Sequence, residues 1–225
     1  MSRATVELVV LVVVAAGTGF AGGLELARRA ANFPEEPEDA PTGRPQVPAV
    51  ALALVTAALF ALTAWRFGVA WELPAFLVLA RNAVLLTVID LRYRLLPHAV
   101  LVPAFAAGAI LLTAAAALTG EWSALLRAGA AALVLFGVYL VLALISPRSL
   151  GMGDVKLAGL LGLYLGWLGW AAVVVGAAAG FVVQALVALV LLAGRRIGLR
   201  SELPFGPAML LGAAVAIAGR DLLLR

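Results

Sequence analysis

The sequence has no cysteine, one histidine and one lysine, and only 12% of its residues are charged. The missing cysteines exclude disulfides and every zinc site that needs a thiolate ligand. The low charge lies outside the range of soluble globular domains, in which roughly a quarter of the residues are charged. Because 64% of the residues are hydrophobic, the composition excludes a soluble domain and indicates a membrane protein.

Long apolar runs recur along the whole chain, and a spanning helix needs ~20 such residues. We predict eight transmembrane helices, at about residues 5–23, 48–65, 72–90, 100–118, 124–145, 155–167, 171–193 and 207–219. The expected fold is therefore an all-α integral membrane protein, a polytopic bundle that forms a single domain over residues 1–225. Residues 31–48, rich in proline and acid, are expected to form a flexible cytoplasmic loop.

Positive charges are distributed unevenly between the two sets of loops that these helices define. One set holds Arg28, Arg29, Arg44, Arg92, Arg94, Arg148, Lys156, Arg195, Arg196 and Arg200, and the other holds Arg3, Arg66, Arg220 and Arg225. Cytoplasmic loops carry the excess of lysine and arginine. We therefore expect the first set in the cytoplasm and both termini outside.

Two of the four aspartates fall at predicted helix ends on the cytoplasmic side. Asp90 ends an apolar run, and Asp154 follows Gly-Met-Gly at the head of another. Each could simply mark a helix end, but ionisable groups at membrane depth are costly and tend to be functional. If packing brings them together, they share one proton. The ionised carboxylate then activates water and the protonated one polarises a carbonyl, which is the chemistry of metal-free peptide hydrolysis.

Residues close to the two aspartates have expected roles of their own. Gly151 and Gly153 are expected to let the backbone turn tightly and approach a substrate strand. Lys156 either orients a carboxylate or extends to the membrane surface. His98 is expected in a loop without a cluster of metal ligands, so we predict neither a metal site nor a cofactor. Arg81, in the middle of the third predicted helix, is expected to face away from Asp90.

Three segments of the sequence resemble the motifs of one family. GMGDVK is similar to the GxGD motif of the type IV prepilin peptidases, which are intramembrane aspartic proteases. IDLRYRLLPH resembles that family's first aspartate motif, and ELPFGPAMLLGA resembles its carboxyl-terminal segment. The matching positions are Asp90 and Pro97 in the first aspartate motif, Gly151, Gly153, Asp154 and Lys156 in GxGD, and Pro204, Phe205, Gly206 and Pro207 in the last. The two prolines of the last motif are expected to stiffen a turn below the site.

The resemblance implies that Asp90 and Asp154 are catalytic. It implies an aspartic endopeptidase in the plasma membrane of a prokaryote, with its site facing the cytoplasm. The expected partners are the lipid bilayer and pilin-like precursors that carry a basic leader and an apolar helix, and no nucleic acid. Bifunctional members also have a cytoplasmic insert with paired CxxC zinc motifs and methylate the new amino terminus. This sequence has no cysteine, so we predict that the N-methyltransferase activity is absent.

Two other functions fit a membrane protein with buried acids. A proton-coupled transporter would use them as relay groups, although transporter acids usually lie near the midplane between matched halves. A non-catalytic assembly component of a pilus or secretion system would not need both aspartates. The sequence has no signal for the oligomeric state, for the precursor that is cut, or for pili, secretion or DNA uptake as its destination.

Overall fold

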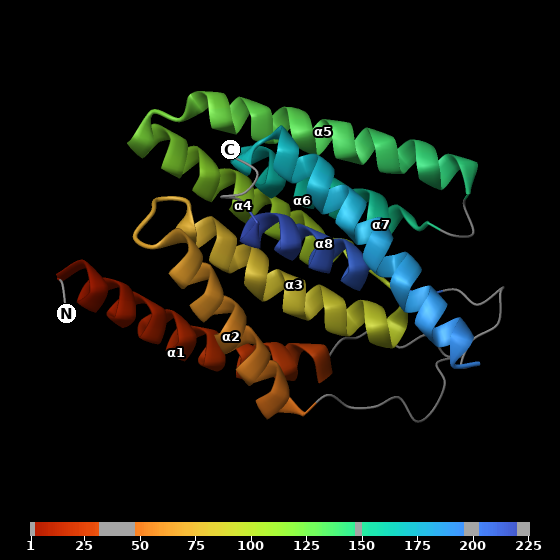
Figure 1. Cartoon of the computed structure of the whole chain (residues 1–225), viewed down its shortest axis with the longest axis horizontal. Helices are drawn as coiled ribbons and strands as arrows, with labels where there is room; N and C mark the ends of the chain where they lie inside the picture. Colours follow the sequence, from red (N-terminus) through yellow and green to blue (C-terminus); the bar gives the residue numbers. More distant parts are fainter. Residues whose placement is uncertain (1–2, 32–47, 147–149, 196–202, 220–225) are drawn as a thin grey trace.

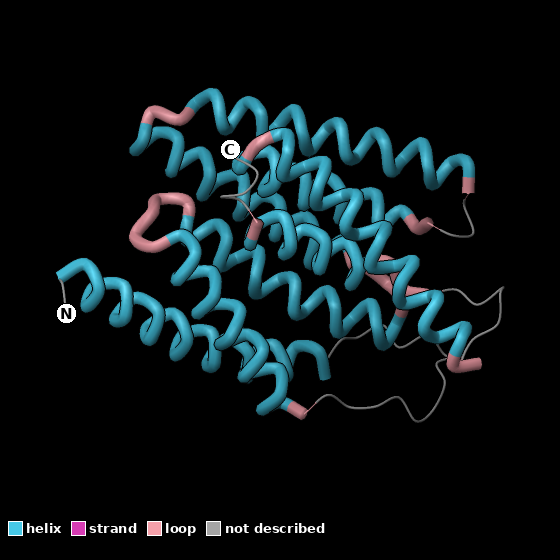
Figure 2. The backbone as a smooth tube through the Cα atoms, in the orientation of Figure 1, coloured by secondary structure: helices cyan, strands magenta, loops and turns pink. Residues whose placement is uncertain are grey.

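The computed structural model describes residues 3–31, 48–146, 150–195 and 203–219. Within these ranges the chain forms helices joined by loops, and it has no strand (Figure 2). The eight helices are α1 (Arg3–Ala31), α2 (Ala49–Phe67), α3 (Leu73–Tyr93), α4 (His98–Thr119), α5 (Trp122–Ile145), α6 (Met152–Leu168), α7 (Trp170–Ala193) and α8 (Gly206–Ala218). The prediction of an all-helical bundle is confirmed. The expected loop at about 31–48 lies almost wholly outside the described residues.

Six of the described helices, α1 to α5 and α7, are long and apolar enough to cross a membrane. The other two are shorter, since α6 has 17 residues and α8 has 13. Side chains that would meet lipid are exposed on the outer helices, for example Val10 of α1 at 55% and Val190 of α7 at 69%. The protein is therefore a multi-pass membrane protein.

The short helix α6 lies at the centre of the bundle. Every residue from Leu157 to Leu168 is buried, and α6 packs closely against α5 while α7 packs against α8 and α1 against α2. Consecutive helices run in opposite directions (Figure 1). As a result the start of α1 and the end of α8 lie at one end of the bundle, and the end of α3 and the starts of α6 and α8 lie at the other.

Glycines allow the helix backbones to approach closely. A Cβ at Gly162 of α6 would lie 2.6 Å from the backbone oxygen of Ala131 in α5. A Cβ at Gly212 of α8 would overlap the backbone nitrogen of Gly180 in α7. Small residues at such interfaces drive helix association in membranes, where neighbouring helices gain no hydrophobic advantage over lipid.

The carboxyl end of α6 is held by an arginine inside the bundle. Arg127 of α5 donates a hydrogen bond from Nε to the Gly166 oxygen at 2.7 Å and one from Nη2 to the Trp167 oxygen at 2.8 Å. The last carbonyls of a helix have no partner within it, and a guanidinium satisfies two of them here. Arg127 was not singled out from the sequence, where it lies inside an apolar run.

Candidate active site

Asp90 lies in the last turn of α3 and is almost completely buried, with 4% of its surface exposed. Its Oδ2 accepts a hydrogen bond from the backbone N–H of Gly206 at 3.0 Å. Its backbone oxygen accepts a hydrogen bond from the N–H of Arg94, which ends α3 in the left-handed conformation with φ 52°. The carboxyl group is therefore directed towards the start of α8.

The Pro204–Pro207 segment provides the donor to Asp90. Gly206 is the first residue of α8, and Pro207 follows it at a position where proline fits a helix. The N–H groups of a first turn lack intrahelical partners, and the positive end of the helix dipole lies there. A Cβ at Gly206 would lie 2.6 Å from Asp90 Oδ2. Only glycine therefore allows this approach. Pro204 and Phe205 lie in the loop before α8, and Gly206 and Pro207 begin the helix, so the stiff turn expected from the two prolines stays a prediction.

Asp154 lies in the first turn of α6. Its Oδ2 accepts a hydrogen bond from the Gly151 N–H at 3.1 Å, an interaction that caps the helix. The helix begins at Met152, three residues before the predicted position, because the polar capping turn is already helical. Asp154 is therefore fixed by its own helix start, whereas Asp90 is fixed by the start of another helix.

The tight turn expected at Gly151 and Gly153 is not present. Gly151 is extended, with φ −83° and ψ 159°, which other residues also adopt, and Gly153 is helical. Gly153 is instead a point of close approach, since a Cβ there would lie 2.7 Å from the Cβ of Leu96. Position 153 therefore requires glycine because there is no room for a side chain, and not because the backbone must be flexible there.

The three sequence motifs meet at one place. The carboxyl groups of Asp90 and Asp154 lie close enough to interact electrostatically. Leu96, buried with 8% exposed, packs against Gly153, and its Cδ1 lies 3.4 Å from where a Gly206 Cβ would be. Leu96 was missed from the sequence, although its place just before Pro97 in the first aspartate motif was a signal.

The histidine and the lysine contact each other beside this site. Pro97 caps α4, and His98 is the first residue of that helix, not the loop residue expected from the sequence. Lys156 Nζ lies 2.8 Å from His98 Nδ1 and 2.9 Å from its Nε2. Lys156 therefore joins α6 to the start of α4, and among the described residues it forms no ion pair with either aspartate.

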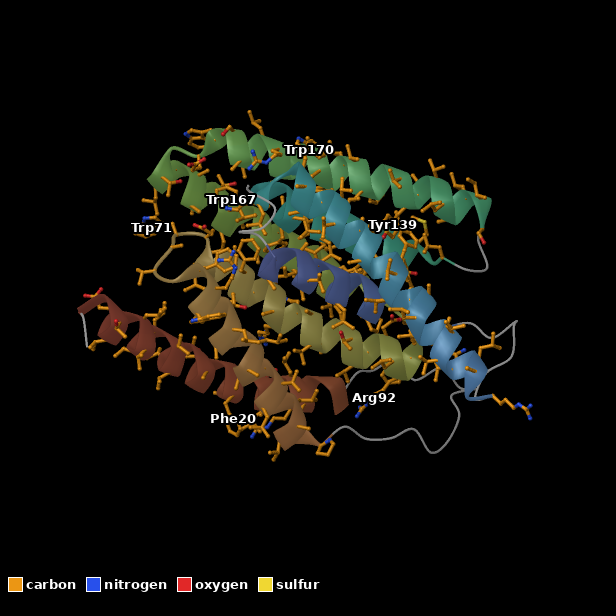
Figure 3. The ribbon with its side chains drawn as sticks, in the orientation of Figure 1. Phe20, Trp71, Arg92, Tyr139, Trp167 and Trp170 are labelled. Carbon is orange, nitrogen blue, oxygen red and sulfur yellow. The ribbon has the colours of Figure 1, made fainter. Side chains whose placement is uncertain are left out.

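Among the residues that the structure describes, no charged side chain forms an ion pair with Asp90 or Asp154. Arg92, labelled at the end of α3 in Figure 3, has no ion pair with Asp90 among the described residues. Arg81 is half-buried in the middle of α3. The part of the chain that the structure describes holds no group of three or more His, Cys, Asp or Glu side chains placed to bind a metal. The arrangement thus offers two carboxyl groups, each with one backbone N–H donor, for acid–base chemistry.

One further polar residue at the site was not found from the sequence. Tyr139 of α5 is buried, with 2% exposed, and its ring stacks with that of Phe205, the residue before Gly206. It lies in an apolar run without any motif. The only feature of the sequence that could have pointed to it is its hydroxyl group within a predicted spanning helix. Figure 3 shows it on the side of the bundle where α5, α7 and α8 come together.

Comparison with known proteins identifies the family. The model of the type IV leader peptidase family matches residues 75–217. A prepilin leader peptidase/N-methyltransferase of Bacillus subtilis (strain 168) is 33% identical over 171 residues, which cover 72% of this chain and 62% of that protein. The protein with the same description from Stutzerimonas stutzeri is 30% identical over 159 residues, covering 70% and 54%. The one from Klebsiella pneumoniae is 36% identical over 115 residues, covering 51% and 50%.

The chain thus spans only between half and two thirds of the length of these relatives. No solved structure matches it. The range that matches the family contains Asp90, Asp154 and Gly206, the residues that meet at the candidate site. The resemblance seen in the three motifs is confirmed, and the chain belongs to the type IV leader peptidase family.

Proposed function

We propose that the protein is a prepilin peptidase, an aspartic endopeptidase that removes the leader of pilin-like precursors. The observation that carries the proposal is the pairing of two acids from different helices. Asp90 of α3 and Asp154 of α6 interact electrostatically, and each accepts one backbone hydrogen bond that fixes its carboxyl group. The membership of the family supports the same activity.

In the proposed mechanism the two carboxyl groups share one proton. The ionised carboxylate removes a proton from a water molecule, and the protonated group donates a hydrogen bond to the scissile carbonyl oxygen. Attack of the water gives a tetrahedral intermediate. The proton taken from water then passes to the leaving nitrogen as the carbon–nitrogen bond breaks. Because the protons are exchanged between the carboxyl groups and the substrate, the dyad returns to its starting state after each cleavage.

The proposed location is the plasma membrane of a prokaryote, with the dyad facing the cytoplasm and both termini outside. The positive charges Arg92, Arg94 and Lys156 support this orientation, since they lie at the dyad end of α3 and α6. A precursor whose apolar helix lies in the bilayer and whose basic leader stays in the cytoplasm would then present its cleavage site to the dyad.

We further propose that the protein cleaves without methylating. The named relatives are described as peptidase/N-methyltransferases, but this chain has no cysteine with which to build the zinc motifs of the family's insert. Purified protein incubated with precursor and S-adenosylmethionine should release a mature chain with a free amino terminus. A product heavier by one methyl group would contradict this.

The test of the proposed activity is co-expression with a prepilin, followed by mass spectrometry of the substrate's amino terminus. Cleavage is expected with the parent protein and none with Asp90→Asn or Asp154→Asn, because an amide cannot exchange the proton. Glu121→Gln is a matched control, since Glu121 caps α5 at the opposite end of the bundle. Cleavage by either aspartate variant at the parent rate would remove that residue from the mechanism.

A further inference from the structure

Gln184 is the only side chain of α7 that carries an amide, and it lies in the second half of a candidate membrane span, Trp170–Ala193. The residue is half-buried, and its carboxamide makes no hydrogen bond to any residue that the structure describes. A polar group at membrane depth is costly without a hydrogen-bond partner. The packing of the described helices therefore gives no reason for a glutamine at this position.

Gln184 lies on the face of α7 that is directed towards α6. Ala177, two turns earlier on the same face, lines a small cavity together with Leu161 of α6. Asp154 lies two turns before Leu161 on the same face of α6. Because α6 and α7 are antiparallel (Figure 1), both steps lead from the cavity towards the dyad end of the bundle, each by ~10 Å. Gln184 and Asp154 are therefore at a similar depth on facing sides of neighbouring helices.

The packing of α7 against α8 gives the same position. A Cβ at Gly180 of α7 would lie 3.3 Å from the Cα of Met209 in α8. These two helices are also antiparallel (Figure 1). Gln184, one turn after Gly180, is therefore level with Phe205, about one turn before Met209. The next residue along the chain donates the N–H that binds Asp90, so Gln184 is level with both halves of the dyad.

This part of α7 has an open surface. The buried residues of α7 all lie in its first half and end at Gly180. Phe181 is already 43% exposed although its ring contacts that of Phe205, and Leu186 is 56% exposed. The described helices therefore leave the surface around Gln184 accessible to another molecule that approaches the dyad.

The chemistry of cleavage in a membrane requires polar partners for the substrate backbone. In a helix every peptide group is bonded within the chain, and the scissile carbonyl becomes accessible to water only when the helix is unwound around it. Unwinding exposes N–H and C=O groups, which are costly to leave without partners at membrane depth. A carboxamide has one oxygen acceptor and two N–H donors, and so it can bind both kinds of group.

We propose that Gln184 is a substrate-binding residue whose carboxamide hydrogen-bonds the peptide backbone of the precursor next to the scissile bond. It accepts from an N–H or donates to a C=O that unwinding has freed, and it thereby holds the extended segment beside Asp90 and Asp154. The proposal rests on the proposed peptidase function. It predicts that Gln184 contributes to cleavage and not to the stability of the resting protein.

The first experiment measures cleavage of a prepilin and thermal unfolding of the enzyme in lipid vesicles. Gln184→Met keeps the length of the side chain but removes its donors and acceptor. It should lower kcat/KM by about 10- to 100-fold, as expected when a backbone group of the substrate is left unpaired, with the unfolding temperature unchanged or raised. Thr113→Val is the control, since the Thr113 hydroxyl is bonded within its own helix, to the Ala109 oxygen at 2.7 Å, and it should keep parent activity. A rate within twofold of the parent, or a lowered unfolding temperature, overturns the proposal.

The second experiment locates the bound precursor directly. Because the chain has no cysteine, Gln184→Cys introduces a single thiol, and it is combined with Asp90→Asn to prevent cleavage. Precursors with one cysteine within three residues of the cut should form a disulfide with position 184. Leu186→Cys is the matched control, since Leu186 is exposed on the opposite side of α7.

Equal cross-linking at positions 184 and 186, or none at 184, overturns the contact. If the parent protein cleaves no precursor, the proposed function fails, and the cross-links alone then decide whether Gln184 binds the precursor.

Discussion

The contact between Gly206 and Asp90 leads to a quantitative prediction for Gly206→Ala. The added methyl group would lie 2.6 Å from Asp90 Oδ2, well inside the 3.4–4 Å of ordinary contacts, so the carboxyl group must turn away and lose its 3.0 Å hydrogen bond. A hydrogen bond to a charged group contributes ~1.5–3 kcal/mol. At ~1.4 kcal/mol per factor of ten in rate, kcat/KM should fall about 10- to 150-fold.

The fold should survive this substitution. The atom that the methyl group displaces belongs to the end of a side chain, and the next neighbour, Leu96 Cδ1, lies at 3.4 Å. The assay is cleavage of a prepilin by purified protein in lipid vesicles, with thermal unfolding in detergent measured in parallel. Gly137→Ala in α5 is the control, since its Cβ would meet nothing within 4 Å. It should keep full activity and gain up to ~1 kcal/mol of helix stability.

Two results would refute this reasoning. Cleavage by Gly206→Ala within twofold of the parent rate would mean that the N–H of Gly206 does not matter for Asp90. A large drop in the thermal unfolding temperature would mean that the backbone, and not the carboxyl group, gives way. Loss of activity in a stable protein is the only outcome that agrees with the geometry.

Three other predictions follow from the described residues and the charge pattern. Arg127→Leu should lower the free energy of unfolding in detergent by ~2–4 kcal/mol, because it leaves the Gly166 and Trp167 carbonyls without their donors; an unchanged unfolding curve would contradict the capping role. Cysteine at position 68 should react with an impermeant reagent from outside the cell and cysteine at position 198 should not; the reverse pattern would invert the topology. Chelators should leave cleavage unchanged, because no metal-binding cluster exists among the described residues, and a loss that added metal restores would point to a missed site.

The helices were predictable because the apolar runs are separated by clear breaks. The fourth and fifth runs predict helices at 100–118 and 124–145, and the helices are His98–Thr119 and Trp122–Ile145. The predicted start of α6 is too late because hydropathy does not detect a capping turn, in which Asp154 accepts the hydrogen bond of the Gly151 N–H and thereby begins the helix. Helix starts predicted from hydropathy alone come too late wherever the first turn of a spanning helix is polar.

The candidate site was predictable only in part. The motifs pointed to Asp90 and Asp154, but no local pattern could indicate that a glycine 116 positions away would donate to Asp90. That contact depends on how α8 packs against α3. The sequence does not single out Tyr139 or Arg127, because each is one polar side chain inside an apolar run. Polar groups in spanning helices are expensive, so they are worth examining one by one even without a motif.

The short length of α6 indicates how deep the dyad lies. Seventeen residues span ~25 Å, against ~30 Å for the hydrocarbon core. The carboxyl end of α6 is fixed by Arg127 at Trp167, and Figure 3 shows Trp71 and Trp167 together at the end of the bundle away from Arg92. If the tryptophan end of α6 lies at the interface, which tryptophans favour, the shortfall of ~5 Å, about one helical turn, falls at the Asp154 end.

We therefore expect the dyad to lie below the membrane surface, at the depth where the apolar helix of a precursor begins. Nitroxide labels at Met152, which is 49% exposed, and at Ile145, which is 75% exposed at the end of α5, compare the two depths. The label at Met152 should be relaxed more by oxygen and less by a water-soluble nickel chelate than the label at Ile145. Equal accessibility of both labels would place Asp154 level with the interface, and a bound precursor would then have to leave the bilayer to be cut.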